Sequence, residues 1–448
     1  MKPAFQEYFR ILIGEEEAEQ FFYSIEKKET RRSVRVNTLK TGKGFLKEWL
    51  LSQGYEVSES LYSSNGLVLE GRGKELALKL PYHAGFTYPQ DEASMFAVEL
   101  LDPKPGEFVL DLTAAPGGKS THMAARMQNT GVLVANDLDT RRLKALHSNL
   151  ERLGIWNAVV TRMPPHKLAE FYPEFFDRIL LDPSCSGEGL FVTYDGKPNF
   201  WNKKSLDRYA SAQFGLLVSA LKLLKVGGRL VYSTCTLNTI ENNGVVERIL
   251  KKIPGVEVEK VETGRAPEQI GAFKGIRFWP HKTKTKGFFC IALTKTMSFD
   301  LEQSSARFER IKFLNEQEVR KAGDLIFESF GCKLPEAVFS LKDGVLFVHS
   351  SELQKFPFLP NSSFSFPLLK VYEDKLRPTH AGALFFGLHA KKKVYELSSE
   401  EVLAAFERQP IPNKGTKEGL YLAKYKNFPI GLAKVTEVRV EIPFPHQY

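Results

Sequence analysis

Cysteine is scarce in this chain of 448 residues, which contains only Cys185, Cys235, Cys290 and Cys332. Four cysteines so widely scattered are too few for a disulfide scaffold, and they lack the close pairing of a zinc site. We therefore predict free thiols in a reducing compartment and no bound metal.

Long apolar runs are also lacking. No stretch approaches the roughly 20 apolar residues that a membrane-spanning helix needs, and the first residues, Met1 to Ala4, lack the apolar core of a signal peptide. We expect a cytoplasmic protein without membrane association.

The composition that is present describes an ordinary globular protein. Hydrophobic residues make up 43% and charged residues 26% of the chain, so it can bury a core, and the length predicts two to four domains. The net charge of +9, with an isoelectric point near 9.1, is compatible with a polyanionic partner.

The most informative stretch runs from residue 106 to residue 137. Phe108 to Leu112 is a short apolar run that predicts a buried parallel strand leading into a Pro-Gly-Gly turn. Helical spacing resumes from Ser120 to Met127, and a second apolar strand covers Val132 to Ala135. Asp137 lies about 20 residues after the turn, where a carboxylate can accept both ribose hydroxyls. This order predicts one β-α-β unit that binds a nucleoside.

Two classes of ligand can use such a unit. Gly117 and Gly118 lack a Cβ atom, which lets either ligand approach the backbone. Residues 113–120 fit a phosphate-binding P-loop except that Thr113 replaces its first glycine. Pro116, however, places a residue without an N–H where phosphate would be bound. We therefore favour S-adenosylmethionine, which has a ribose and no phosphate, over the nucleotide of a hydrolase; a turn without any ligand stays open.

Strands and helices alternate between residue 83 and about residue 298. This pattern predicts a doubly wound, Rossmann-like α/β sheet covered by helices on both faces. In such sheets ligands bind beyond the carboxyl ends of the strands. Asp111, Asp137, Asp182 and Cys235 all fall at the ends of predicted strands, so we expect them to line one crevice.

A methyl donor next to cysteines indicates a particular chemistry. Carbon 5 of a pyrimidine is a poor nucleophile until a thiolate adds to carbon 6, an acid supports ring N3, and a base later removes the carbon 5 proton. Cys185 and Cys235, each at a predicted strand end, satisfy this requirement together with Asp182. Cys290 and Cys332 keep the ordinary interpretation of a cysteine, which is a small buried apolar side chain.

Residues 1–82 form a separate predicted α/β unit. Arg31, Arg32 and Arg35 lie on a strand within it. Two interpretations of these arginines stay open, namely contacts to phosphates and a solvated strand face.

These motifs, taken in order, make the chain resemble the Sun family of RNA cytosine-5 methyltransferases, and within it the bacterial enzymes that modify 16S ribosomal RNA. The resemblance is strong over residues 1–298 and looser beyond them. The motifs that carry it are Gln90 to Met95, Asp111 to Lys119, Asn136-Asp137, Asp182 to Gly189, and Ser233 to Thr236.

The resemblance implies a role for each motif. Cys235 would be the nucleophile, and Cys185 would assist release of the product. Asp182 would contact the cytosine beside the donor, and Lys119 would help to place Asp182. The residues expected to bind S-adenosylmethionine are Thr113, Ala114, Ala115, Pro116, Gly117, Gly118, Lys119, Asp137 and Asp182.

The resemblance also implies the domains and the partner. We expect an N-terminal RNA-binding α/β domain at 1–82, a Rossmann-like catalytic domain at 83–298, a ferredoxin-like domain at 299–370 and a PUA-like RNA-binding domain at 371–448. The expected partner is RNA, either 16S rRNA or the small ribosomal subunit, bound by a monomer.

Two departures from the family pattern bear on the site. The chain has Asp182-Pro183-Ser184-Cys185 where the family usually has Asp-Ala-Pro-Cys, and the acid that contacts the adenine in relatives is missing near Met163-Pro164. Two alternatives therefore stay open. One is a nucleotide hydrolase built on Lys119 and Asp182, and the other is a catalytically silent RNA-binding assembly factor.

Overall fold

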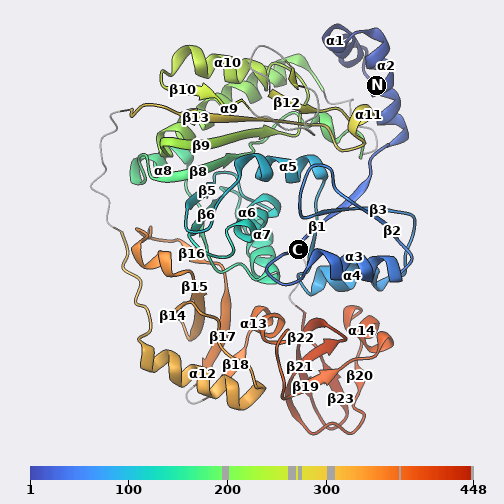
Figure 1. The fold of residues 1–448 in the computed structure, drawn as a ribbon, viewed down its shortest axis with the longest axis vertical. Helices are drawn as coiled ribbons and strands as arrows, with labels where there is room; N and C mark the ends of the chain where they lie inside the picture. Colours follow the sequence, from blue (N-terminus) through green and yellow to red (C-terminus); the bar gives the residue numbers. More distant parts are fainter. Residues whose placement is uncertain (194–200, 261–268, 271–274, 300–307, 373–374, 445–448) are drawn as a thin grey trace.

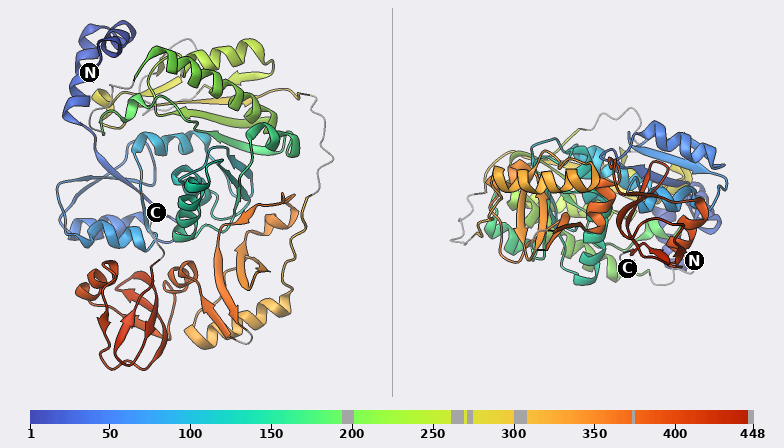
Figure 2. Two further views of the ribbon diagram at one scale, coloured as in Figure 1. Left: turned by 180° about the vertical axis from the view of Figure 1, so that it is seen from behind. Right: turned by 90° about the horizontal axis from the view of Figure 1, so that it is seen from below.

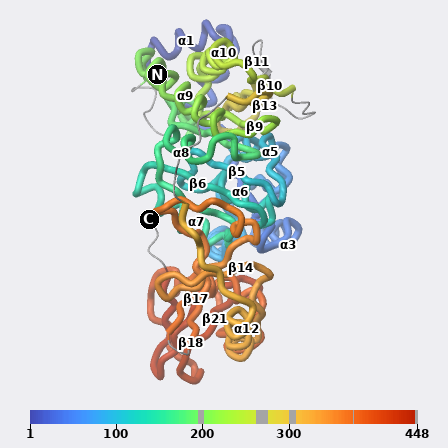
Figure 3. The backbone as a smooth tube through the Cα atoms, turned by 90° about the vertical axis from the view of Figure 1, so that its left-hand side faces the viewer, coloured from blue at the N-terminus to red at the C-terminus, as the bar shows by residue number. Residues whose placement is uncertain are grey.

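The computed structural model describes residues 1–448 apart from 194–200, 261–268, 271–274, 300–307, 373–374 and 445–448. The described residues form four β-sheets. In Figure 1 the largest sheet and its helices occupy the upper half of the molecule, and the two C-terminal sheets lie below it. Figure 3, turned by 90°, shows the same C-terminal units at one end of the long axis.

The N-terminal sheet is antiparallel, with the strand order β2-β3-β1-β4, and two helices cover it. Its core joins Val34 and Leu67 of the sheet to Leu46 and Leu50 of α3. Two earlier helices pack away from this sheet, against Trp279 of the large sheet's edge. The elements are α1 (Pro3–Ile13), α2 (Glu15–Lys27), β1 (Arg32–Val36), α3 (Lys43–Ser52), β2 (Glu56–Glu59), β3 (Gly66–Glu70), α4 (Leu76–His83) and β4 (Thr87–Pro89).

The large sheet has the order β11-β12-β13-β9-β8-β5-β6-β7-β16, with β10 beside β13. Strands β9, β8, β5, β6 and β7 run parallel, and β13 is antiparallel to β9. Its elements are α5 (Glu92–Leu101), β5 (Phe108–Asp111), α6 (Gly118–Arg126), β6 (Val132–Asn136), α7 (Thr140–Leu153), β7 (Ala158–Thr161), α8 (Pro165–Phe171), β8 (Phe176–Leu181), η1 (Glu188–Leu190), α9 (Lys203–Leu223), β9 (Leu224–Thr234), α10 (Asn243–Lys252), β10 (Val256–Val258), β11 (Gln269–Ile270), β12 (Gly275–Phe278), α11 (Pro280–Thr283) and β13 (Phe288–Lys295).

Apolar cores cover both faces of this sheet, as its continuous apolar strands require. On one face, residues such as Val109 and Leu133 pack against α5, α6 and α7. On the other, residues such as Leu110 and Val134 pack against α8, α9 and α10. The predicted doubly wound, Rossmann-like sheet is confirmed, and the carboxyl ends of β5, β6, β8 and β9 point to one edge.

Two smaller sheets follow, with the orders β14-β15-β17-β18 and β19-β21-β22-β23-β20, while β16 extends the large sheet by pairing with β7. Seen from behind and from below in Figure 2, the two sheets lie next to each other. The elements are α12 (Glu316–Phe330), β14 (Val338–Lys342), β15 (Val345–His349), η3 (Ser351–Lys355), β16 (Ser363–Phe364), β17 (Pro367–Tyr372), β18 (Lys375–Pro378), α13 (His380–Phe386), β19 (Val394–Glu396), α14 (Ser399–Phe406), β20 (Ile411–Pro412), β21 (Gly419–Tyr425), β22 (Phe428–Val435) and β23 (Arg439–Glu441).

Within the described parts of the chain, every helix is either too short or too polar to span a bilayer.

Candidate active site

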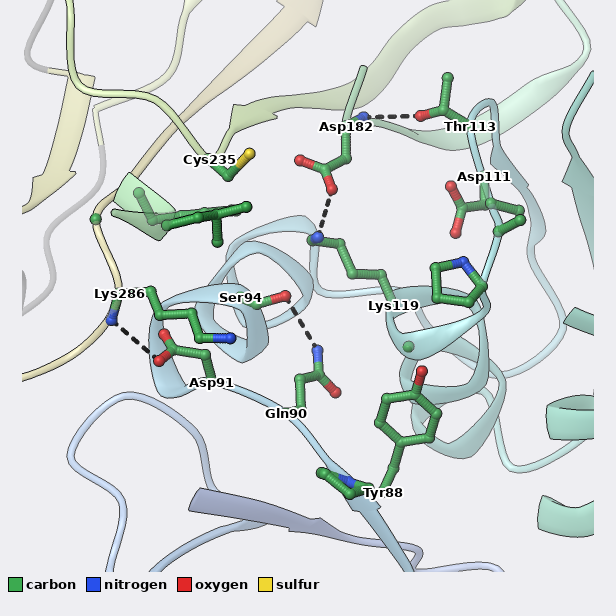
Figure 4. Close-up of a pocket in the computed structure, with 18 residues that line it drawn as sticks. Tyr88, Gln90, Asp91, Ser94, Asp111, Thr113, Lys119, Asp182, Cys235 and Lys286 are labelled. Carbon is green, nitrogen blue, oxygen red and sulfur yellow. Dashed lines mark hydrogen bonds and ion pairs between the residues drawn. The ribbon is translucent and has the colours of Figure 1, made fainter. Parts of the chain in front are cut away.

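The Pro-Gly-Gly turn joins β5 to α6 and forms one wall of a cavity of about 270 Å³ (Figure 4). Gly117 has a φ of 104°, and a Cβ atom there would come within 2.9 Å of the Leu146 side chain. A Cβ atom on Gly118 would lie 3.1 Å from the ring of Tyr88. The turn therefore requires glycine at position 117. At position 118 the lack of a Cβ atom leaves the backbone close to the cavity.

Asp137 holds the turn to the end of β6. Its carboxylate accepts hydrogen bonds from the backbone N–H of Ala115 at 3.1 Å and of Asp139 at 3.0 Å. The guanidinium of Arg142 lies 3.5 Å from the same carboxylate, whose side chain is 6% exposed. The structure thus places Asp137 behind the turn, and it does not contribute to the cavity lining.

Lys119 and Asp182 form an ion pair in the centre of the cavity. The Lys119 ammonium donates to Asp182 Oδ2 at 2.5 Å, and the Ser233 hydroxyl donates to Asp182 Oδ1 at 2.9 Å. Burial opposes the charge of Lys119, but the negative groups around it, Asp182 first, raise its pKa above the ordinary value. Lys119 therefore stays protonated, and Asp182 is held in one orientation.

The two predicted cysteines are in contact. The sulfur atoms of Cys185, which follows β8, and Cys235, which follows β9, are 2.8 Å apart. Cys235 lines the cavity, beside Asp182 in Figure 4, whereas Cys185 is not among the lining residues. The hydrogen bond to Cys235, with burial, raises the pKa of the Cys185 thiol well above its usual range, so this thiol is protonated at neutral pH.

Two buried glutamates fasten the cysteine loops to each other. Glu188, from the loop after Cys185, accepts the N–H groups of Leu237 at 2.9 Å and Asn238 at 2.8 Å. Glu241, beyond Cys235, accepts the N–H of Ser186 in return, at 3.1 Å. Each loop therefore supplies the acceptor that fixes the other, which keeps the two sulfurs together.

Replacing Glu188 by glutamine should break this arrangement. The carboxylate now accepts hydrogen bonds from N–H groups, and the amide N–H groups of glutamine would face these donors instead of accepting from them. The side chain is fully buried, so water cannot compensate for the loss. We expect Glu188→Gln to lower the free energy of unfolding by about 2–4 kcal/mol. Urea unfolding of this variant, compared with the exposed Glu316→Gln, measures the loss; equal stability of both variants would contradict the role of Glu188.

Asp111 and the turn fit the cationic part of a methyl donor. Asp111 lines the cavity and accepts from Ser120 through Oδ2 at 2.6 Å, while its Oδ1 is buried and has no hydrogen-bond partner. Burial raises the pKa of Asp111 to about 7. A sulfonium or ammonium group near Asp111 would favour its ionised carboxylate.

The affinity for S-adenosylmethionine should consequently increase with pH. Because a cation favours ionised Asp111, binding releases a proton from the raised carboxyl group, and the gain from pH 6 to pH 8 should be roughly tenfold for a pKa of about 7. Calorimetric titrations across this range measure it. Asp111→Asn should remove this part of the pH dependence. The amino group of the ligand titrates equally with both proteins, so it does not affect the comparison. Identical affinity–pH profiles for the variant and the unaltered protein would contradict the expectation.

The remaining cavity wall was not assigned a role from sequence. It runs from β4 to the first turn of α5 and includes the segment that leads into β13. There Asp91 accepts the N–H of Lys286 at 3.0 Å, and burial raises the pKa of Asp91 to about 6. A signal was present, since Gln90 to Met95 is one of the ordered motifs. The lining residues on this side are Tyr88, Pro89, Gln90, Asp91, Ser94, Lys286, Gly287 and Phe288.

Arg35 serves the site through hydrogen bonds to the first residues of α6. It is only 1% exposed and donates to the carbonyl oxygen of Gly118 at 2.5 Å and to the hydroxyl of Thr121 at 2.7 Å. Neither a phosphate contact nor a solvated strand face describes this residue. It ties the N-terminal sheet to the start of α6.

A parallel sheet with a glycine turn after one strand, a carboxylate after the next, and a buried acid in the cavity wall defines an S-adenosylmethionine-dependent methyltransferase. The described residues contain no group of three or more His, Cys, Asp or Glu suited to a metal ion.

Comparison with known proteins agrees with this class. The family model "16S rRNA methyltransferase RsmB/F" matches residues 98–294. Ribosomal RNA small subunit methyltransferase F of Erwinia tasmaniensis is 30% identical, over 99% of this chain and 96% of the relative. The protein of the same name from Aeromonas salmonicida is 32% identical, over 93% of this chain and 90% of the relative. The chain therefore belongs to the RsmB/F family of 16S rRNA methyltransferases.

Solved structures agree as well. A methyltransferase homologue from Pyrococcus horikoshii is 32% identical, covers 66% of this chain and 95% of its own, and has a TM-score of 0.59. NSun6 from the same organism, solved with the S-adenosylmethionine analogue SFG, is 26% identical over 65% of this chain and 98% of its own, with a TM-score of 0.60. The resemblance found in the sequence is confirmed, and it rules out the nucleotide-hydrolase alternative.

Proposed function

We propose that this methyltransferase forms 5-methylcytosine in 16S rRNA through a covalent bond between Cys235 and carbon 6 of the base. The observation that carries the proposal is that Cys235 and the Lys119–Asp182 pair line the same cavity as the Pro-Gly-Gly turn. A methyltransferase acting on a nitrogen or a ribose oxygen has no use for a thiol at this position.

Attack by Cys235 activates the base. Its sulfur forms a bond to carbon 6 while ring N3 takes a proton, which leaves carbon 5 with the electron density of an enamine. Asp182 is the group suited to N3, because Lys119 and Ser233 fix its carboxyl group next to Cys235, where it can carry the proton that the Cys235 thiol loses to N3 while Lys119 stays protonated. When bound, S-adenosylmethionine supplies an electrophilic methyl group, and carbon 5 accepts it.

Cys185 is suited to release the product. After methyl transfer, a base must take the proton from carbon 5, so that the carbon 5–carbon 6 double bond returns, the sulfur–carbon 6 bond breaks and N3 loses its proton. Contact with Cys235 is the first cause of the raised pKa of Cys185. Once the Cys235 sulfur is bonded to carbon this cause disappears, which favours release of the Cys185 proton to solvent, and the thiolate then takes the carbon 5 proton.

We assign the donor to the residues predicted for it, with the glycine turn, Thr113 to Lys119, against the donor and Asp182 beside the methyl group. Asp137 holds the turn from outside the cavity lining, and we assign the ribose to it because it directly follows the neighbouring strand β6. Thr113 supports Asp182 through a hydrogen bond from the Asp182 N–H to its hydroxyl at 3.2 Å. At the position of the missing acid, the Met163 N–H donates to Asn136. Leu138, next to Asp137, is 50% exposed. We therefore propose that an apolar contact from Leu138 to the adenine replaces the contact of the missing acid.

We also propose that the remaining units bind the RNA and that the enzyme acts as a cytoplasmic monomer. The domains would be 1–82 and 371–448 for RNA, with a PUA-like fold in the second, 83–298 for catalysis, and a ferredoxin-like fold at 299–370. The four sheets fall close to these limits, which supports the division. Two strands cross the limits, because β4 pairs with β1 of the N-terminal sheet and β16 pairs with β7 of the large sheet.

Bisulfite sequencing of 16S rRNA from a deletion strain tests this function. One or more cytosines that resist conversion in the parent strain should become convertible in the deletion strain. Expression of the unaltered enzyme should restore them, and expression of Cys235→Ala should not. If the same cytosines stayed protected in all strains, the proposed function would be wrong; RNA treated with the purified enzyme provides the matched check in vitro.

A further inference from the structure

A second cavity, of about 650 Å³, lies between the N-terminal sheet and the C-terminal five-stranded sheet. We call it the basic groove and define it by Arg32, Lys79, Tyr82, His83, Pro89, Phe406, Arg408 and Phe444. In Figure 1, α4 lies directly above the sheet that contains β22, with α14 beside it. A shared apolar core, in which Leu80 and Phe86 pack with Val402 and Ile430, holds the two walls at a fixed separation.

The charge of the basic groove is of one sign. Arg32, Lys79 and Arg408 are exposed, and no Asp or Glu occurs among the described residues that line it. Lys79 pairs with Glu75 at 2.6 Å. Within the described chain no carboxylate lies within ion-pair distance of Arg32 or Arg408, and both residues are exposed, so both guanidinium groups are available to an anion.

Aromatic rings form the opposite part of the groove. His83 stacks on Phe406 with a centroid distance of 4.3 Å and an angle of 26°, and Phe444 lies 5.7 Å from His83. Burial lowers the pKa of His83 to about 4, so it presents a neutral ring at physiological pH. Paired rings of this kind are a stacking surface for unpaired bases, because every base has an aromatic face.

The groove adjoins the catalytic cavity. Successive residues of β4 point to opposite faces of its sheet: Tyr88 lines the catalytic cavity and Thr87 lines the groove. Pro89, at the end of β4, is exposed and lines both. A chain that enters the catalytic cavity with one base can therefore pass over Pro89 into the groove.

We propose that the basic groove binds the nucleotides next to the target cytosine as a single strand of RNA, with bases on the His83–Phe406 pair and phosphates on Arg32 and Arg408. Unpaired bases suit half-buried rings, whereas a duplex keeps its bases inside and offers only its backbone. An acidic protein segment would use the arginines but leave the stacked rings without a matching group. The inference rests on the proposed function for its target base and extends it to the neighbouring nucleotides.

Fluorescence anisotropy with a labelled 12-nucleotide oligouridine tests the inference on the full-length protein. The double variant Arg32→Glu/Arg408→Glu should bind about tenfold or more weakly at low salt, with a smaller dependence on salt because two phosphate contacts are lost. Phe406→Leu, which keeps apolar packing and removes the ring, should weaken binding by about threefold or more. Arg320→Glu, an exposed arginine on α12, is the matched control and should change binding by less than about twofold.

Two further measurements make the outcome decisive. Calorimetry with S-adenosylmethionine should give the unaltered affinity for every variant, which shows that the fold is kept. A 12-base-pair RNA duplex should bind more weakly than the single strand and respond less to Phe406→Leu. Oligouridine affinity that is unchanged in the double variant, or a preference for the duplex, would overturn the inference. Oligouridine contains no cytosine, so these results are independent of whether 5-methylcytosine is formed.

Discussion

Replacement of Cys235 by alanine should reduce methyl transfer to RNA by on the order of 10³-fold or more, because carbon 5 of the base then lacks the addition that activates it. The loss should appear in the rate constant of a single turnover, measured with isotope-labelled S-adenosylmethionine and a 16S rRNA transcript. Affinity for the methyl donor should change by less than about twofold, since Cys235 is placed on the side of the base.

Cys290→Ala is the matched control for this variant. Cys290 is a fully buried cysteine on β13, next to β9, and does not line the cavity. We expect it to retain activity within about threefold, with a modest loss of stability from the smaller side chain. Normal turnover by Cys235→Ala would show that the roles of the two site cysteines are assigned wrongly.

Replacement of Cys185 should have an effect of a different kind. Cys185→Ala should still allow attack and methyl transfer, but without the base the methylated RNA stays bonded to Cys235. We therefore expect a covalent protein–RNA complex that accumulates to a large fraction of the enzyme and survives denaturing electrophoresis. The double variant Cys185→Ala/Cys235→Ala should form none.

The position of Cys185 gives this prediction its physical reason. Its sulfur is 2.8 Å from that of Cys235, so it lies next to any base bonded there. Cys332→Ala, which changes a buried cysteine in a C-terminal core, should form no complex above the unaltered protein. Free RNA product from Cys185→Ala at the normal rate would assign the base to another group.

The sequence predicted the central sheet well, because its signals are local. Apolar runs such as Phe108 to Leu112 mark buried strands over a few residues, and glycines such as Gly117 mark a turn whose φ needs them. The carboxyl ends of parallel strands meet at one edge of the sheet. Residues distant in sequence, such as Asp182 and Cys235, could therefore be predicted to lie close together.

Contacts over long sequence separations could not be predicted in the same way. Glu188 looks like a polar residue in a glycine-rich loop, yet it is fully buried and accepts N–H groups from residues about fifty positions later. Arg35 alternates along a strand as a solvent-facing residue would, but its partners lie on α6. The basic groove is likewise formed by segments from both ends of the chain, and no periodicity records it.

The most direct test of the covalent mechanism is peptide mass spectrometry of the enzyme treated with 16S rRNA that contains 5-fluorocytidine. Fluorine at carbon 5 cannot be removed as a proton, so the adduct should persist, and the modified nucleotide should be found on the peptide that contains Cys235. Attachment to the peptide of Cys185, or no adduct although unmodified RNA is methylated, would contradict the account.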